Sequence, residues 1–75
     1  MSEQALRDLD ILADFEVALR NLFGPYESAS EVVGRLADRR RYQDTARPLR
    51  YAMGNCPPSM LIAAVSALRG ALEEE

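Results

Sequence analysis

Apolar side chains recur at spacings of three and four residues through most of this 75-residue chain, and no stretch alternates apolar with polar residues as a half-buried strand would. The pattern therefore predicts an all-helical protein. Its first stretch predicts a helix over residues 2–23, with Ser2 as the amino-terminal cap and Gly24 followed by Pro25 as the stop signal. The buried face of this helix is expected to comprise Ile11, Leu12, Phe15, Ala18, Leu19 and Leu22.

The opposite face of this first helix is polar. Val17 lies inside the polar stripe, and Leu6 and Leu9 lie toward its edge. These three apolar side chains are therefore expected to contact something outside the core of the chain. The polar stripe itself comprises Glu3, Arg7, Asp10, Asp14 and Asn21.

The middle of the chain predicts two shorter helices. Ser28 and Glu31 have the spacing of a capping box, so the second helix is expected to begin at Ser28 and to fray near Tyr42. A third helix is expected over residues 46–53, because Pro48 is tolerated only in a first helical turn, where amide donors lack partners. A single helix through both segments, kinked at Pro48, is the alternative.

The last helix is predicted to begin at Pro57 and Pro58, since proline is favoured at the first helical position, and to run to about Leu72. Apolar side chains cover nearly its whole circumference, and such a helix is normally buried. So short a chain can hardly surround one helix on all sides. The helix is therefore expected either to lie at the centre of a bundle or to pack against a second chain. The surface for that second chain comprises Met60, Ala63, Ala64, Ala67, Leu68 and Ala71.

The size of the chain limits what can stabilise it. A chain of 75 residues makes one domain, and domains this small often need disulfides, a metal ion or a partner. Cys56 is the only cysteine and there is no histidine, so neither an intramolecular disulfide nor a zinc site is expected. We therefore predict a single domain over residues 1–75. It is expected to be an all-α bundle of three to four helices, stabilised as a dimer, with the last helix packed across the first two.

Charge is distributed unevenly along the chain. The formal net charge is −3, yet residues 35–50 hold six arginines and two acids and so carry +4. Three interpretations of this segment compete: a solvated helix face paired with acids of the first helix, a docking surface for an acidic protein, or a phosphate-binding surface for nucleic acid. Net acidity disfavours the third, because the remaining surface would repel a nucleic-acid backbone. The residues expected to bind a partner are Arg39, Arg40, Arg41, Tyr42, Arg47, Arg50 and Tyr51.

The sequence offers little that could support catalysis. A nucleophilic Cys56 would need a base, and the chain has no histidine to serve as one. No glycine-rich phosphate loop or cluster of metal ligands is present, so neither a metal nor a cofactor is expected. The carboxylates of the first helix are expected to be solvated rather than placed in a pocket: Asp8, Asp10, Asp14 and Glu16.

The function predicted from the sequence is that of a non-catalytic protein-interaction module. It would be a small regulator, inhibitor or co-chaperone that binds another protein, as a homodimer or as a subunit of a hetero-complex. A small DNA- or RNA-binding regulator that uses residues 35–50 is the alternative. The amino terminus does not resemble a signal peptide, and no apolar run approaches the roughly 18–20 residues of a membrane span, so a cytoplasmic location away from the membrane is expected.

Overall fold

The computed structural model describes residues 2–21 and 26–74, and it confirms the all-α prediction. This part of the chain contains no strand. The Cα radius of gyration is 11.1 Å, close to the value of about 11 Å expected for a single compact domain of this length. The elements are the α-helices α1 (Glu3–Arg20), α2 (Glu27–Ala37), α3 (Gln43–Asn55) and α4 (Pro58–Glu73), and the short 3-10 helix η1 (Arg40–Tyr42).

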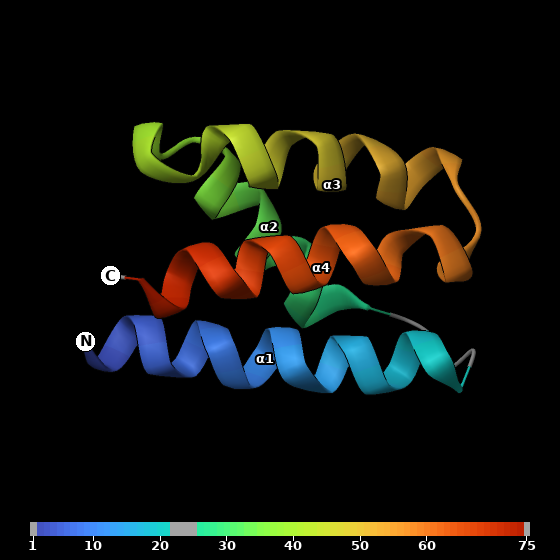
Figure 1. Ribbon diagram of the computed structural model, residues 1–75, viewed down its shortest axis with the longest axis horizontal. Coiled ribbons are helices and arrows are strands. Elements are labelled where there is room, and N and C mark those ends of the chain that lie inside the picture. Colours follow the sequence, from blue (N-terminus) through green and yellow to red (C-terminus); the bar gives the residue numbers. More distant parts are fainter. Residues whose placement is uncertain (1, 22–25, 75) are drawn as a thin grey trace.

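Three of the helices lie side by side in one layer, and α2 lies behind them (Figure 1). In the middle of the layer, α4 runs antiparallel to both of its neighbours, α1 and α3. The expectation that the last helix packs across the first two is confirmed for α1 and wrong for α2, because no Cα atom of Pro58–Glu73 lies within 8 Å of one in Glu27–Ala37. The connection between α3 and α4 is only Cys56 and Pro57, and so short a connection makes the two helices antiparallel neighbours.

The amino-terminal cap of α1 is confirmed. The backbone amide of Ala5 donates to the hydroxyl oxygen of Ser2 over 3.1 Å, which satisfies one of the amides that a helix start leaves without a partner. The expected face is partly correct, since Ile11 and Ala18 are half-buried rather than buried. The expected end of this helix, at residues 22–25, lies outside the described residues. The buried stripe comprises Ala5, Asp8, Leu12, Phe15 and Leu19.

The capping box predicted for α2 is wrong. The helix begins at Glu27, so Ser28 is its second residue and Tyr26 takes the cap position without a side-chain capping bond. The ring of Tyr26 packs on that of Phe15, with 4.9 Å between the ring centroids. The helix therefore begins beside this aromatic pair, without the local hydrogen bonds of a capping box.

The boundary between α2 and α3 also differs from the prediction. The second helix ends at Ala37 rather than fraying near Tyr42, because Arg39 adopts an extended backbone (φ −95°, ψ 126°) that no helix can continue through. This break rules out the single kinked helix. The third helix is longer than expected, and Pro48 is its sixth residue rather than part of its first turn.

The core lies where the layer meets α2. Leu49 of α3 and Tyr42 of η1 are buried there together with the inner side of α4. Tyr42 is only 1% exposed, although the sequence predicted a surface anchor at this position. The buried side chains of α4 are spaced by three and four residues and comprise Leu61, Val65, Leu68 and Leu72.

Candidate functional site

The side of α4 that faces away from the core carries small, uncharged side chains along most of its length. The residues on this side again follow spacings of three and four, so they form a second stripe opposite the buried one. All of them are exposed except Gly70, which is half-buried. We call them the outer stripe: Met60, Ala63, Ala67, Gly70 and Glu74.

Large apolar side chains gather on the same layer of the fold. Among the described residues, four large hydrophobic side chains are more than half exposed, and none of them belongs to α2. Met60 lies on α4, Tyr51 on α3, and Leu6 and Val17 on α1. Leu9, the third apolar residue predicted to face outward, is instead half-buried against the core. In the part of the chain that the structure describes, the large exposed apolar side chains therefore all lie on helices of the layer.

The structure divides the interface predicted for the last helix into two groups. Met60, Ala63 and Ala67 are exposed, as an interface requires. Leu68 is 0% exposed, so its inclusion was wrong: it lies on the inner stripe, three residues after Val65, and contacts the core. Two further residues of the predicted interface are half-buried and pack against the core, namely Ala64 and Ala71.

One arginine of the basic segment, Arg35, forms a partly buried ion pair with an acid of the first helix. This agrees with the interpretation that the segment pairs with acids of that helix, although the sequence did not identify the two residues. Both terminal nitrogens of Arg35 donate to the two carboxylate oxygens of Asp8, over 3.0 and 2.9 Å. The side-chain amide of Gln4 donates to the same carboxylate over 3.1 Å. Asp8 is 1% exposed, so the expectation of a solvated carboxylate is wrong at this position. The pair joins α1 to α2 across the molecule.

Arg35 keeps its positive charge throughout the ordinary pH range. The hydrogen bond to Asp8 raises the pKa of Arg35 above its already high usual value, against a smaller lowering by burial. A raised pKa means that the contribution of Arg35 to stability is present at every pH below the usual arginine value and is lost only above it. The guanidinium is therefore a permanent structural cation and not a group that titrates during function.

The other arginines of residues 35–50 differ in what they contact. The Nε of Arg47 donates to the carbonyl of Ala37 over 3.2 Å and so satisfies an acceptor at the end of α2. A terminal nitrogen of Arg41 donates to the carbonyl of Glu74 over 3.3 Å, at the end of α4. Arg39 and Arg40 lie on the turn before α3, and Arg50 lies on α3 itself. These three residues are exposed, as Arg41 and Arg47 also are.

Tyr42 serves as a platform for two of these arginines. The guanidinium carbons of Arg39 and Arg41 lie 5.5 and 5.9 Å from the centroid of its ring, within the range of cation–π attraction. Because the ring is buried, Tyr42 positions the two arginines and is not itself available to a partner. Tyr51, the other tyrosine predicted to bind, is exposed.

A third group of charges joins α1 to α4. Glu16 is half-buried and forms an ion pair with Arg69 of α4. The same carboxylate lies 3.7 Å from Arg20, one turn later on α1. The prediction that Glu16 is simply solvated is therefore wrong, because this carboxylate links α1 to α4 through its ion pair with Arg69.

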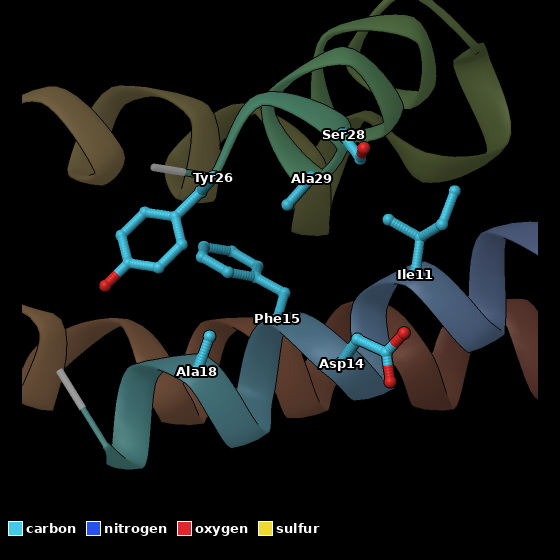
Figure 2. A pocket seen from close by; sticks show the side chains of 7 residues that line it. All are labelled: Ile11, Asp14, Phe15, Ala18, Tyr26, Ser28 and Ala29. Carbon is cyan, nitrogen blue, oxygen red and sulfur yellow. The ribbon is translucent and has the colours of Figure 1, made fainter. Parts of the chain in front are cut away.

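A pocket of about 270 Å³ opens between α1 and the start of α2 (Figure 2). Its described polar groups do not converge on one point. In Figure 2 the Tyr26 hydroxyl and the Asp14 carboxylate lie on opposite sides of the Phe15 ring. General acid–base or nucleophilic chemistry needs such groups within hydrogen-bonding reach of one another, so these residues do not form a catalytic arrangement. The lining residues are Ile11, Asp14, Phe15, Ala18, Tyr26, Ser28 and Ala29.

Two further findings concern the described residues as a set. No three carboxylate or thiol side chains in residues 2–21 and 26–74 come together as they would to hold a metal ion. In the same residues, no helix has both the length and the apolar character needed to cross a membrane. Cys56 is half-buried at the connection between α3 and α4 and is not part of a disulfide.

Comparison with known proteins returns no relative: no family model, no curated protein and no solved structure matches this chain. The geometry of the described residues singles out the outer stripe of α4, together with the exposed apolar residues on the two helices that flank it.

Proposed function

We propose that this chain is a non-catalytic protein-interaction module, a small regulator, inhibitor or co-chaperone that binds a partner protein through the outer stripe of α4. The observation that carries the proposal is the exposure of Met60, Ala63 and Ala67 on a helix whose opposite side forms the core. A helix in the middle of a layer with an uncharged exposed side is a surface that water solvates poorly and that a partner can cover.

The composition of the outer stripe suits a helix or another flat apolar surface as the partner. Small side chains such as Ala63 and Ala67 let a second backbone approach closely, toward the lower end of the 8–10 Å separation between packed helices. Met60 adds an unbranched, adaptable side chain of the kind often used at binding surfaces. Tyr51 of the neighbouring α3 is exposed and has the chemistry of an interface anchor.

The arginine segment supports this proposal better than it supports nucleic-acid binding. Arg35, Arg47 and Arg41 each donate to an oxygen of the chain itself, which leaves fewer guanidinium groups to contact phosphates. The exposed Arg39 and Arg40 can flank a docked protein as polar neighbours of an apolar contact. Nucleic-acid binding by residues 35–50 is the alternative that the capture experiment with and without nuclease distinguishes.

The test is affinity capture from a native lysate with and without nuclease, using the wild-type chain and two variants. Ala67→Glu places a charge in the outer stripe, and Ser30→Glu places the same charge on an exposed position of α2, behind the layer. We expect a discrete protein that survives nuclease, is lost with Ala67→Glu and is retained with Ser30→Glu. Capture that depends on nucleic acid, or that Ala67→Glu leaves unchanged, would overturn the proposal.

A further inference from the structure

We propose that the partner covering the outer stripe is a second copy of this chain, packed so that the two α4 helices run antiparallel about a twofold axis. This inference rests on the proposed function, because it assigns an occupant to the same surface. Three observations carry it: the arrangement of large and small side chains along the stripe, the charges at its two ends, and the area of the layer.

The side-chain sizes along the outer stripe favour an antiparallel copy. In an antiparallel pair centred between Ala63 and Ala67, these alanines oppose each other and each Met60 opposes Gly70 of the second copy. A Cβ added at Gly70 would meet no heavy atom within 4 Å, so there is open space there for a methionine side chain. A parallel pair would set methionine against methionine and glycine against glycine, which leaves one end overfilled and the other empty.

The charges at the ends of α4 favour the same arrangement. The first turn of α4 contains no acidic residue, and Pro57 at its cap position provides no side-chain capping bond. The last turn contains no basic residue, and Glu73 and Glu74 are exposed there. The start of α4 therefore lacks the negative charge that the helix dipole favours, and its end carries two acids, with Arg41 of η1 as the cation that donates to a carbonyl there. In an antiparallel pair, Glu74 of each copy lies at the uncapped start of α4 in the other copy.

The layer formed by α1, α4 and α3 is large enough for such a pair. The molecule measures 30 × 20 × 18 Å, and the layer is its broad side (Figure 1). A stable interface covers about 800 Å² on each partner, which is about a sixth of the 4821 Å² surface of this chain. A twofold pair also uses the same patch on both copies, so a single patch is sufficient. The exposed Tyr51, Leu6 and Val17 lie on the helices that border the centre.

Sedimentation equilibrium of the untagged chain tests the stoichiometry. We expect a mass of twice 8.4 kDa for the wild type and for Ser30→Glu, and a folded monomer for Ala67→Glu. Because Ala67 is exposed within one copy, the helical circular dichroism of this variant should match that of the wild type. A monomeric wild type at the highest soluble concentration would overturn the inference, as would a dimer that Ala67→Glu leaves intact.

Disulfide trapping in a Cys56→Ala background tests the orientation and does not depend on the folding of Ala67→Glu. Ser66 is exposed beside the centre of the stripe, so Ser66→Cys should cross-link to its own copy. Met60→Cys should not cross-link to its own copy, because ten residues of helix, or about 15 Å, separate it from the same position on the second copy. Mixing Met60→Cys with Gly70→Cys should form the cross-link. Self-linking of Met60→Cys would show a parallel pair and refute the proposed geometry.

The same samples distinguish this inference from the proposed function. A monomeric chain that still captures another protein through Ala67 refutes self-association and leaves the proposed function standing. A dimer broken by Ala67→Glu, with no other protein captured by the wild type or by a monomeric variant, supports self-association and refutes action on a separate partner.

Discussion

At the scale of single residues, the ion pair between Asp8 and Arg35 should respond differently to the loss of each partner. Asp8 is buried, whereas the side chain of Arg35 is 40% exposed and can reach water. Removing Arg35 therefore leaves a buried charge without its main partner, and Arg35→Ala is expected to cost about 3–5 kcal/mol of unfolding free energy. Asp8→Ala leaves a solvated guanidinium and should cost about 1.5–3 kcal/mol, the range for hydrogen bonds to charged groups. Urea denaturation measures both.

The matched control for this pair is the exposed ion pair on the first helix. Arg7 lies 3.4 Å from Glu3, and both side chains are largely exposed. Arg7→Ala should change the unfolding free energy by less than about 0.5 kcal/mol, as is usual for exposed pairs one helical turn apart. Equal losses for Arg35→Ala and Asp8→Ala would show that burial of the carboxylate does not set the cost.

The residues that the sequence mispredicted were assigned by their chemical type rather than by their position in a stripe. Asp8 lies three residues after Ala5 and four before Leu12, so it continues the buried stripe, and spacing alone could have placed it inside. Its partner Arg35 is 27 residues away and is not recoverable from local pattern. Leu68 could likewise have been separated from Ala67, because only Leu68 is spaced by three and four from Val65 and Leu72.

At the scale of helices, the prediction gave the order and type of the elements but misplaced several ends. The cap of α1 at Ser2 and the start of α4 at Pro58 follow from local chemistry, and both are confirmed. The start of α2 lies at the ring contact between Tyr26 and Phe15, and a contact between separate elements leaves no local signal. The break at Arg39 comes three residues before the buried Tyr42, and the charged residues around Tyr42 do not indicate its burial.

Pro48 gives the prediction that belongs to this scale. It is exposed in the interior of α3 and has no N–H to donate to the carbonyl of Asp44 one turn earlier. Proline in a helix interior costs about 3 kcal/mol relative to alanine, offset in part because proline also restricts the unfolded chain by about 1 kcal/mol. Pro48→Ala should therefore raise the unfolding free energy by about 1–2 kcal/mol in urea denaturation.

Gly34→Ala is the control for Pro48→Ala. It lies within α2, and an added Cβ would meet no heavy atom within 4 Å, so it should gain only the helix-propensity difference of about 0.5–1 kcal/mol. If Pro48→Ala destabilises the chain while Gly34→Ala stabilises it, the proline is required for the way α3 packs on α2 and α4, and the propensity argument fails at that position.

At the scale of the whole molecule, the sequence predicted the fold class but not the neighbours. An excess of apolar residues in α4 indicated that this helix would be central, buried, or shared with a second chain. The structure gives it a central position and an exposed side at once, since α1 and α3 flank it and nothing in the described chain covers the outer stripe. The positions of α1 and α3 on either side of α4 depend on the two-residue connection before α4 and on the length of α3. The sequence did not predict either feature.

Self-association should also appear in the thermal stability of the whole molecule. If two copies unfold together to separate chains, Tm rises with protein concentration, because mass action favours the folded dimer. With an unfolding enthalpy of about 0.7 kcal/mol per residue over two copies, Tm should rise by about 5 °C for each tenfold increase in concentration. The folded monomer expected for Ala67→Glu should show no such rise, and Ser30→Glu should behave as the wild type. A wild-type Tm that is constant across a hundredfold concentration range would mean that the outer stripe remains uncovered by a second copy.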